Sequence, residues 1–100
     1  MSRLRAEIDA LAAEYRRALP QRLGQLEVLL ADARLAELER ELHTLAGSAG
    51  TFGLPRLGQA AGAAEAYLAS CGARLDDAQR AELKRLLALL KEASATIGRP

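Results

Sequence analysis

Residues 43–53, His-Thr-Leu-Ala-Gly-Ser-Ala-Gly-Thr-Phe-Gly, contain the single histidine of the chain and continue a helical pattern that begins upstream. The apolar residues of this segment recur at alternating steps of three and four: Leu35, Leu38, Leu42, Leu45, Ala49 and Phe52. This spacing places them on one face of a helix, and His43 lies well off that face. The segment therefore predicts an amphipathic helix whose histidine faces water.

The residues that follow His43 on its own face are small. They are Ala46, Gly47 and Gly50, although a glycine inside a helix costs roughly 1 kcal/mol relative to alanine. A surface kept this low lets a second protein bring its backbone and a reactive group close to the imidazole. We infer that access to His43 is the purpose of these residues.

The length and composition favour one helical domain. One hundred residues suffice for a single modest core and not for two, so we expect residues 1–100 to form one domain. Half of the residues are hydrophobic, mostly alanine and leucine, and the β-branched aliphatics are only Ile8, Val28 and Ile97. This composition favours helix strongly over strand.

The N-terminal third of the chain predicts helix on both sides of Pro20. Apolar residues keep helical spacing before the proline, at Leu4, Ile8, Leu11, Tyr15 and Leu19, and after it, at Leu23, Leu26 and Leu30. Proline is tolerated at the start of a helix and kinks a helix interior, so Pro20 marks either a new helix or a kink. Residues 31–34 are the expected break, with Asp32 able to cap the helix that follows.

Two further helices are expected after Gly53. Leu54-Pro55 opens the first of them, and Gly72 is placed to end it through a left-handed conformation. Asp76 and Gln79 have the spacing of a capping box at the start of the last helix. The apolar stripe of that helix is Leu83, Leu86, Leu90, Ala93 and Ile97, closed by Gly98 and Pro100.

Short connections between helices that are apolar on one side predict an antiparallel bundle. The expected fold is all-α: an antiparallel up-down four-helix bundle with an additional N-terminal helical segment as an extension or lid. Such a bundle would hold the helix of His43 rigid, which a loop could not do.

Charge and hydropathy exclude several partners. The net charge is +1, from 14 basic and 13 acidic residues, so there is no electrostatic case for nucleic acid or for an anionic membrane. No run of about 20 apolar residues exists for membrane insertion, and we expect a cytoplasmic location. Cys71 is alone, which excludes an intramolecular disulfide and a cysteine-based metal site; we expect it to be a small buried apolar group.

The stretch beginning at His43 resembles the signature of histidine-containing phosphotransfer domains. In that family the histidine is followed by a basic residue three positions on, glycine four on, and a small residue or serine five on. The counterparts here are His43, Ala46, Gly47 and Ser48. The resemblance continues through residues 51–57 and covers nearly the whole chain in outline. The departure is Ala46, where the family usually has lysine.

The resemblance implies a phosphorelay intermediate. His43 would accept a phosphoryl group from the aspartate of a receiver domain of a response regulator and pass it to another receiver, and a hybrid histidine kinase is a further possible partner. Neutral imidazole is a good nucleophile near pH 7, and the Mg²⁺ that neutralises charge would belong to the receiver. We therefore expect no cofactor or metal in this chain, no ATP-dependent kinase activity, and a monomer.

Other site residues follow from the same resemblance. A polar residue of the neighbouring helix would hydrogen-bond one ring nitrogen, with Glu65 as first choice and Gln59 as second. Arg40, three residues before His43, would replace in part the charge missing at position 46. The expected docking surface is formed by Thr44, Ala46, Gly47 and Gly50. Ser48 is expected to be structural, bonding a backbone carbonyl one turn back.

Two alternative hypotheses belong to other classes. The first is a binding module that keeps the docking surface but has lost phosphotransfer and docks a receiver or a histidine kinase; Ala46 is its sequence support. The second is a structural bundle that dimerises through an apolar stripe, which leaves the glycines around His43 unexplained.

Overall fold

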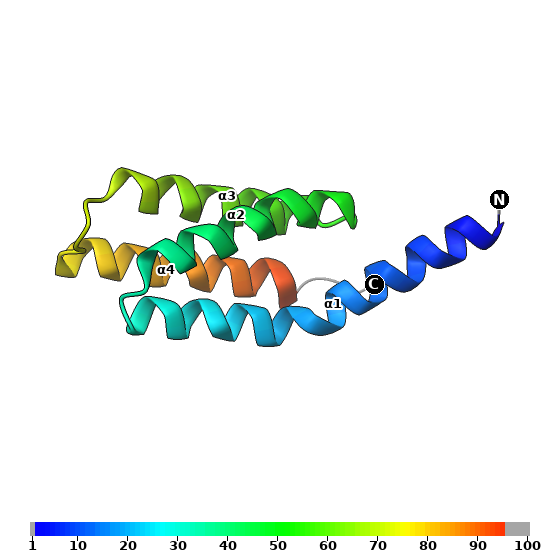
Figure 1. The fold of residues 1–100 in the computed structure, drawn as a ribbon, viewed down its shortest axis with the longest axis horizontal. Helices are drawn as coiled ribbons and strands as arrows, with labels where there is room; N and C mark the ends of the chain where they lie inside the picture. Colours follow the sequence, from blue (N-terminus) through cyan, green and yellow to red (C-terminus); the bar gives the residue numbers. More distant parts are fainter. Residues whose placement is uncertain (1, 96–100) are drawn as a thin grey trace.

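The computed structural model describes residues 2–95, which form four α-helices (Figure 1). They are α1 (Ser2–Ala31), α2 (Leu35–Thr51), α3 (Pro55–Ser70) and α4 (Asp77–Ala95). Each helix packs against its neighbour in the chain, and α4 returns to pack against α1. This is the antiparallel up-down arrangement that the sequence predicts.

A core dominated by leucine lies between the four helices. The stripe of α2 points into it, with Leu38, Leu42 and Ala49 completely buried. The other helices contribute Leu19, Leu23, Leu26, Leu29, Leu30, Leu57, Ala61, Ala64, Leu68, Leu83, Leu86, Leu87 and Leu90. Burying a leucine side chain stabilises a fold by about 1.5–3 kcal/mol, so this stripe fixes which face of α2 remains for His43.

The expected N-terminal segment is the first part of α1, a single helix of 30 residues with Pro20 inside it. Of the two interpretations of Pro20, a new start is wrong. Figure 1 shows α1 turning away from the other three helices near its middle, as an internal proline favours. Every residue from 2 to 11 is exposed, and we call this part the N-terminal arm.

The turn between α1 and α2 corrects the predicted role of Asp32. The N-cap residue of α2 is Arg34, which makes no side-chain capping bond. Ala33 instead adopts a left-handed conformation with φ of 56°, and its N–H and that of Arg34 bond the carbonyls of Leu30 and Leu29. These two bonds form a Schellman motif. The turn therefore serves the end of α1 and leaves the start of α2 without a side-chain cap.

The end of α2 follows the prediction, whereas the end of α3 does not. Gly53 has a φ of 78°, and Leu54 N–H bonds the Ala49 carbonyl, which completes a second Schellman motif. At the end of α3, Cys71 is extended and Gly72 is not left-handed. The half-buried Cys71 directs its Sγ to the Tyr67 carbonyl at 3.3 Å, so the helix ends without needing Gly72 in that conformation.

The start of α4 is capped as expected. Asp76 N–H donates to Gln79 Oε1 at 3.0 Å, and Gln79 N–H donates to Asp76 Oδ1 at 2.7 Å. This reciprocal pair is a capping box. The predicted closing residues of the helix, Ile97, Gly98 and Pro100, lie outside the described residues.

Gly58 lets α3 approach α2 closely, and its replacement provides a test of that contact. A Cβ at Gly58 would lie 3.3 Å from the Ala46 carbonyl oxygen, whereas one at Gly62 would meet nothing within 4 Å. We expect Gly62→Ala to raise the free energy of unfolding by about 0.5–1 kcal/mol through helix propensity. Gly58→Ala should gain none of this, because a helix backbone atom cannot move aside as a flexible side chain does.

Denaturant unfolding of the two variants measures this difference directly. Gly62→Ala is the matched control, since it is the same substitution one turn further along the same helix. Equal stabilities for the two variants would contradict the close approach of α2 and α3 at Gly58.

Candidate functional site

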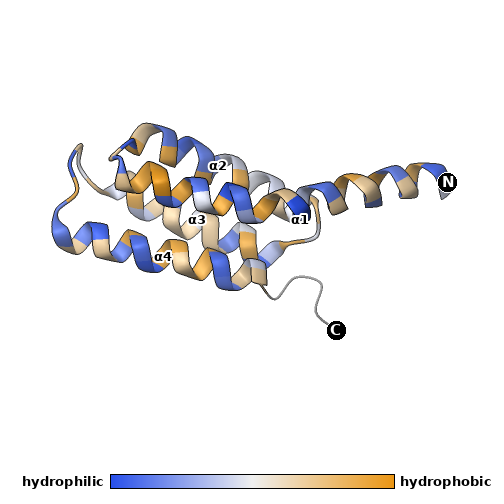
Figure 2. Cartoon of the chain, turned by 90° about the horizontal axis from the view of Figure 1, so that it is seen from below, coloured by the Kyte–Doolittle hydropathy of each residue, from blue (hydrophilic) through white to orange (hydrophobic). Residues whose placement is uncertain are grey.

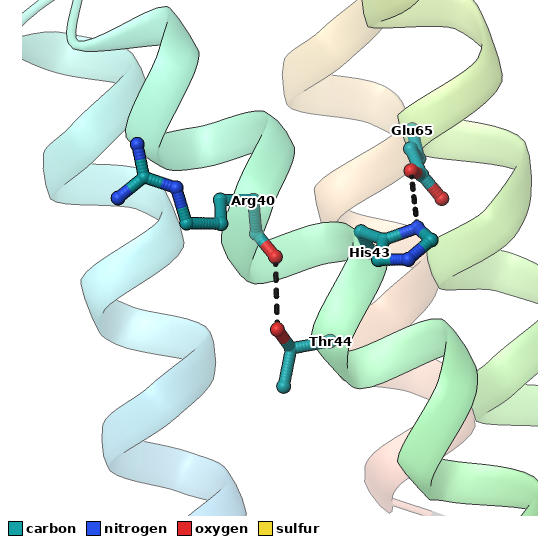
Figure 3. A network of polar contacts seen from close by, with 4 residues as sticks. All are labelled: Arg40, His43, Thr44 and Glu65. Atoms are coloured by element: carbon teal, nitrogen blue, oxygen red, sulfur yellow. Dashed lines mark hydrogen bonds and ion pairs between the residues drawn. The ribbon is translucent and has the colours of Figure 1, made fainter.

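His43 lies on the outer side of α2, and its imidazole is paired with a carboxylate from α3. The His43 side chain is 77% exposed, while that of Glu65 is 26% exposed. Glu65 Oε2 lies 2.8 Å from His43 Nδ1, a contact drawn in Figure 3. Glu65 is the first-choice partner from the sequence, and the structure brings it to the ring.

This bond determines which nitrogen is free. A carboxylate only accepts hydrogen bonds, so Nδ1 carries the proton and donates to Glu65. The neutral ring then has its lone pair on Nε2. Figure 3 shows this second nitrogen on the side of the ring away from Glu65. The geometry thus presents a nucleophilic nitrogen to the outside of the bundle.

The close contact of α2 and α3 positions the carboxylate. At Gly58 the two backbones approach, since a Cβ there would lie 3.6 Å from Ala49 Cβ and 3.7 Å from Gly50 N. Glu65 follows Gly58 by seven residues, or about two turns, and so lies on the same face of α3. A short side chain such as glutamate therefore reaches the His43 ring across the helix pair.

The remaining docking residues form an open surface with one exception. A Cβ at Gly47 or Gly50 would meet nothing within 4 Å, and Thr44 is exposed. Ala46 is half-buried and packs against the core, so it lies at the edge of the α2–α3 contact. The surface beside His43 is therefore open at Gly47 and Gly50, as the small residues of the sequence predict.

Neither Arg40 nor Gln59 is hydrogen-bonded to the imidazole ring. The carbonyl of Arg40 accepts a hydrogen bond from Thr44 Oγ1 at 3.1 Å, and Figure 3 shows the guanidinium directed away from the imidazole. Gln59 is exposed and is not hydrogen-bonded to His43. Glu65 is thus the hydrogen-bonding partner of the imidazole among the described residues.

The opposite flank of α2 is held by Tyr15, which the sequence interpretation did not include in the site. Tyr15 Oη and Ser48 Oγ are 2.7 Å apart, and the Tyr15 ring stacks on Phe52 with centroids 4.6 Å apart. The Arg22 guanidinium lies 5.5 Å from the centroid of the Tyr15 ring. The predicted bond of Ser48 to a backbone carbonyl is therefore wrong, because the hydroxyl pairs with a side chain of α1.

Other charged pairs lie away from this site. Lys91 pairs with Glu27 between α4 and α1, and Arg34 with Glu37 at the start of α2. On α4, hydrogen bonds from the Arg85 guanidinium hold the pKa of the Glu82 carboxyl below its usual value. Within residues 2–95, no three or more His, Cys, Asp or Glu side chains gather as a metal-binding group.

Comparisons with known proteins place the chain near one family. A family model described as Hpt domain matches residues 3–96. Neither the curated proteins nor the solved structures gave a match. Among the described residues, none of the helices has the length and apolar character needed to cross a membrane.

Proposed function

Because this chain belongs to the Hpt domain family, we propose that His43 accepts a phosphoryl group from the aspartate of one receiver domain and passes it to another. Hpt domains transfer phosphoryl groups in two-component phosphorelays, interact with receiver domains and kinases, and are not kinases themselves. The proposal assigns the carrier role to one nitrogen of this chain. It is made for a multistep relay in which the chain is an intermediate.

One observation carries the proposal: the 2.8 Å bond from His43 Nδ1 to Glu65 on a side chain that is 77% exposed. In the proposed step, the Nε2 lone pair forms a bond to phosphorus as the acyl oxygen–phosphorus bond of the aspartyl phosphate breaks. The aspartate leaves as a carboxylate, and the proton on Nδ1 stays with the ring. The phosphorylated ring carries a positive charge on its two nitrogens, which the Glu65 carboxylate stabilises.

The reaction needs positioning and charge neutralisation more than covalent help. The helix bundle positions the imidazole for in-line attack, and Mg²⁺ in the receiver supplies the neutralising charge. This chain would accordingly need no metal or cofactor of its own. Arg40 would add positive charge at the docking surface after rotation of its side chain, because it lies three residues before His43 on α2.

Incubation with a panel of radiolabelled phospho-receiver domains tests the proposal. We expect the wild-type chain to take up label that is labile in acid and stable in base, and to lose it when a second, unphosphorylated receiver is added. A panel that binds the chain but transfers no label would contradict the proposal.

That contrary result would instead favour a docking module without phosphotransfer. The observation in favour of this second function is Ala46, which stands where the family usually has lysine and so places no positive charge three residues after His43. In this case Ala46→Lys would be expected to introduce phosphotransfer. Label on the wild-type chain therefore supports the relay. Label that appears only on Ala46→Lys supports the docking module.

Glu65 provides a further prediction. We expect Glu65→Ala to slow single-turnover phosphotransfer by at least about tenfold, as for other residues that orient a reactive imidazole. Glu65→Gln should slow phosphotransfer less, because its amide oxygen still accepts a hydrogen bond from Nδ1. Nitrogen-15 shifts of the ring should show the same tautomer in wild type and Glu65→Gln, and a mixture in Glu65→Ala.

Gln59→Ala is the matched control for Glu65→Ala, since it removes an exposed polar side chain from the same helix. It should leave both rate and tautomer unchanged. If Glu65→Ala transferred phosphate at the wild-type rate with the wild-type tautomer, Glu65 would be only a solvated charge.

A further inference from the structure

A groove runs along the outside of the bundle between α1 and α4. The two helices pack against each other, and Figure 2 shows them side by side. The groove has a volume of about 540 Å³, and its apolar lining comes from Leu30, Ala31, Leu87 and Ala88. Its other lining residues are charged: Glu27, Arg80, Lys84 and Lys91. An apolar surface with a few polar groups at its sides is typical of a binding site.

Two polar contacts cross the groove near its ends. Arg80 Nη1 donates to the Leu30 carbonyl at 3.1 Å. Further along α4, Lys91 pairs with Glu27. Lys84 lies between these contacts and is exposed, and it pairs with no carboxylate in the part of the chain that the structure describes. The middle of the groove therefore carries a cation without a partner.

The charge of the groove is not balanced along its own helix. Arg80 and Lys84 are four residues apart on α4, and like charges at this spacing destabilise a helix. The other residues three or four steps from Lys84 are Ala81, Leu87 and Ala88, none of which is acidic. Three cations and one carboxylate give the groove a net charge of +2, whereas the whole chain has +1. The groove is therefore complementary to an anionic partner.

The spacing of the cations indicates the shape of that partner. Arg80, Lys84 and Lys91 lie on one side of α4, and at 1.5 Å per residue they span about 16 Å along the helix axis. A small anion with one charged group reaches only part of this span. A helix of about three turns covers all of it. Acidic residues on such a helix can face the three cations while its apolar residues pack on Leu87 and Ala88.

A second copy of this chain is a poor occupant of the groove. The segment that it could insert is the N-terminal arm, whose apolar residues are exposed. The arm carries Arg3 and Arg5 as well as Glu7 and Asp9, so it brings as much positive as negative charge. A partner with an excess of acidic residues is a better complement.

The groove lies on the side of the bundle opposite His43. Contacts link α1 to α2, α2 to α3, α3 to α4 and α4 to α1. The helices thus form a ring in which the edge between α1 and α4 is opposite the edge between α2 and α3. His43 and Glu65 pair across that second edge. A partner in the groove therefore leaves the imidazole open.

We propose that the groove between α1 and α4 binds an acidic amphipathic helix of another protein, whose carboxylates pair with Arg80, Lys84 and Lys91. This inference goes beyond the proposed function, because it assigns a second binding surface that does not require phosphotransfer. Lys84 is the main contact, since Arg80 and Lys91 already have partners within the chain. Such a helix attaches the chain to another protein while His43 stays open to a receiver.

Fluorescence anisotropy of a labelled synthetic peptide tests the inference. The probe is a helical peptide of about 16 residues, with glutamates at the spacing of Arg80, Lys84 and Lys91 and leucines along the adjacent side of the helix. We expect saturable binding that weakens as the salt concentration rises. Lys84→Glu should raise the dissociation constant by about tenfold or more, because it replaces attraction by repulsion at the centre of the groove. Since Lys84 is exposed, this variant should remain folded.

Arg56→Glu is the matched control, because it makes the same change of charge at an exposed residue of α3. It should leave the dissociation constant unchanged, and a peptide with lysines in place of the glutamates should not bind. A second variant, Ala88→Glu, places a carboxylate inside the groove four residues after Lys84. It should weaken peptide binding by a similar factor. Its free energy of unfolding should stay close to that of wild type, since the new ion pair offsets the lower helix propensity of glutamate.

Several results would overturn the inference. One is the absence of binding at about 1 mM peptide, and another is an equal loss of affinity in Lys84→Glu and Arg56→Glu. A third is a wild-type dimer in sedimentation that Lys84→Glu converts to a monomer, which would assign the groove to a second copy. A fourth is competition between the peptide and a phospho-receiver that labels the wild-type chain, which would place the peptide beside His43. Failure of wild type to take label without peptide is a separate result, since it removes the proposed function and leaves the binding measurement intact.

Discussion

His43→Gln should take no acid-labile, base-stable label from any phospho-receiver that labels the wild-type chain. The amide of glutamine has no lone pair comparable to that of the imidazole Nε2, so the nitrogen–phosphorus bond cannot form. The expected loss is complete, limited by the background of the radiolabel assay. No second histidine exists in the sequence to replace it.

The variant should remain folded, which makes the result interpretable. The His43 side chain is 77% exposed and its bond to Glu65 is a surface contact, and exposed pairs of this kind contribute about 0–1 kcal/mol. Thermal unfolding of His43→Gln should therefore stay close to that of wild type. Label of wild-type amount and acid lability on His43→Gln would show that another residue is the acceptor.

Gly47→Leu should stabilise the helix and yet block phosphotransfer. Gly47 lies four residues after His43 on α2, and a Cβ there would meet nothing within 4 Å. Leucine gains about 0.5–1 kcal/mol of helix propensity over glycine. Its side chain then occupies the space through which, in the proposed function, a receiver approaches Nε2. We expect the rate of phosphotransfer to fall by about a hundredfold or more, since a misplacement of about 1 Å already costs about that much.

Gly24→Leu is the control for this substitution. Gly24 is also a helical glycine at which an added Cβ would meet nothing within 4 Å, but it lies on α1, nine residues and so about 180° from Tyr15. It should raise stability similarly without affecting the rate. Wild-type transfer by Gly47→Leu would show that the receiver does not approach over this turn of α2.

Much of this fold follows from residue spacing alone. The leucine stripes predict four amphipathic helices, and the Asp76–Gln79 capping box is a local signal that the structure confirms. Local signals fail where two conformations differ little in energy. At residues 32–33, Asp32 is a good cap, but the left-handed turn at Ala33 satisfies the carbonyls at the end of α1 instead.

The candidate site is also predictable from the sequence only in part. The exposure of His43 follows from helical periodicity, and the family resemblance places Glu65 beside it. The contact of Tyr15 with Ser48 depends on the register between α1 and α2, which lie 33 residues apart in the chain at this point. A single sequence carries no signal for that register. The spacing of Leu11 and Tyr15 predicts that they share a helix face, but it does not predict which helix Tyr15 contacts.

The exposure of the imidazole has a consequence for how such a carrier evolves. A reactive side chain that is exposed on the outer side of a helix is not enclosed by a pocket. It therefore cannot reject a wrong partner by shape at the reacting atoms. Discrimination must then come from residues at the periphery, which contribute little to the core. Those residues are free to change without loss of folding or reactivity, so the choice of partner can diverge between related carriers while the transfer chemistry stays constant.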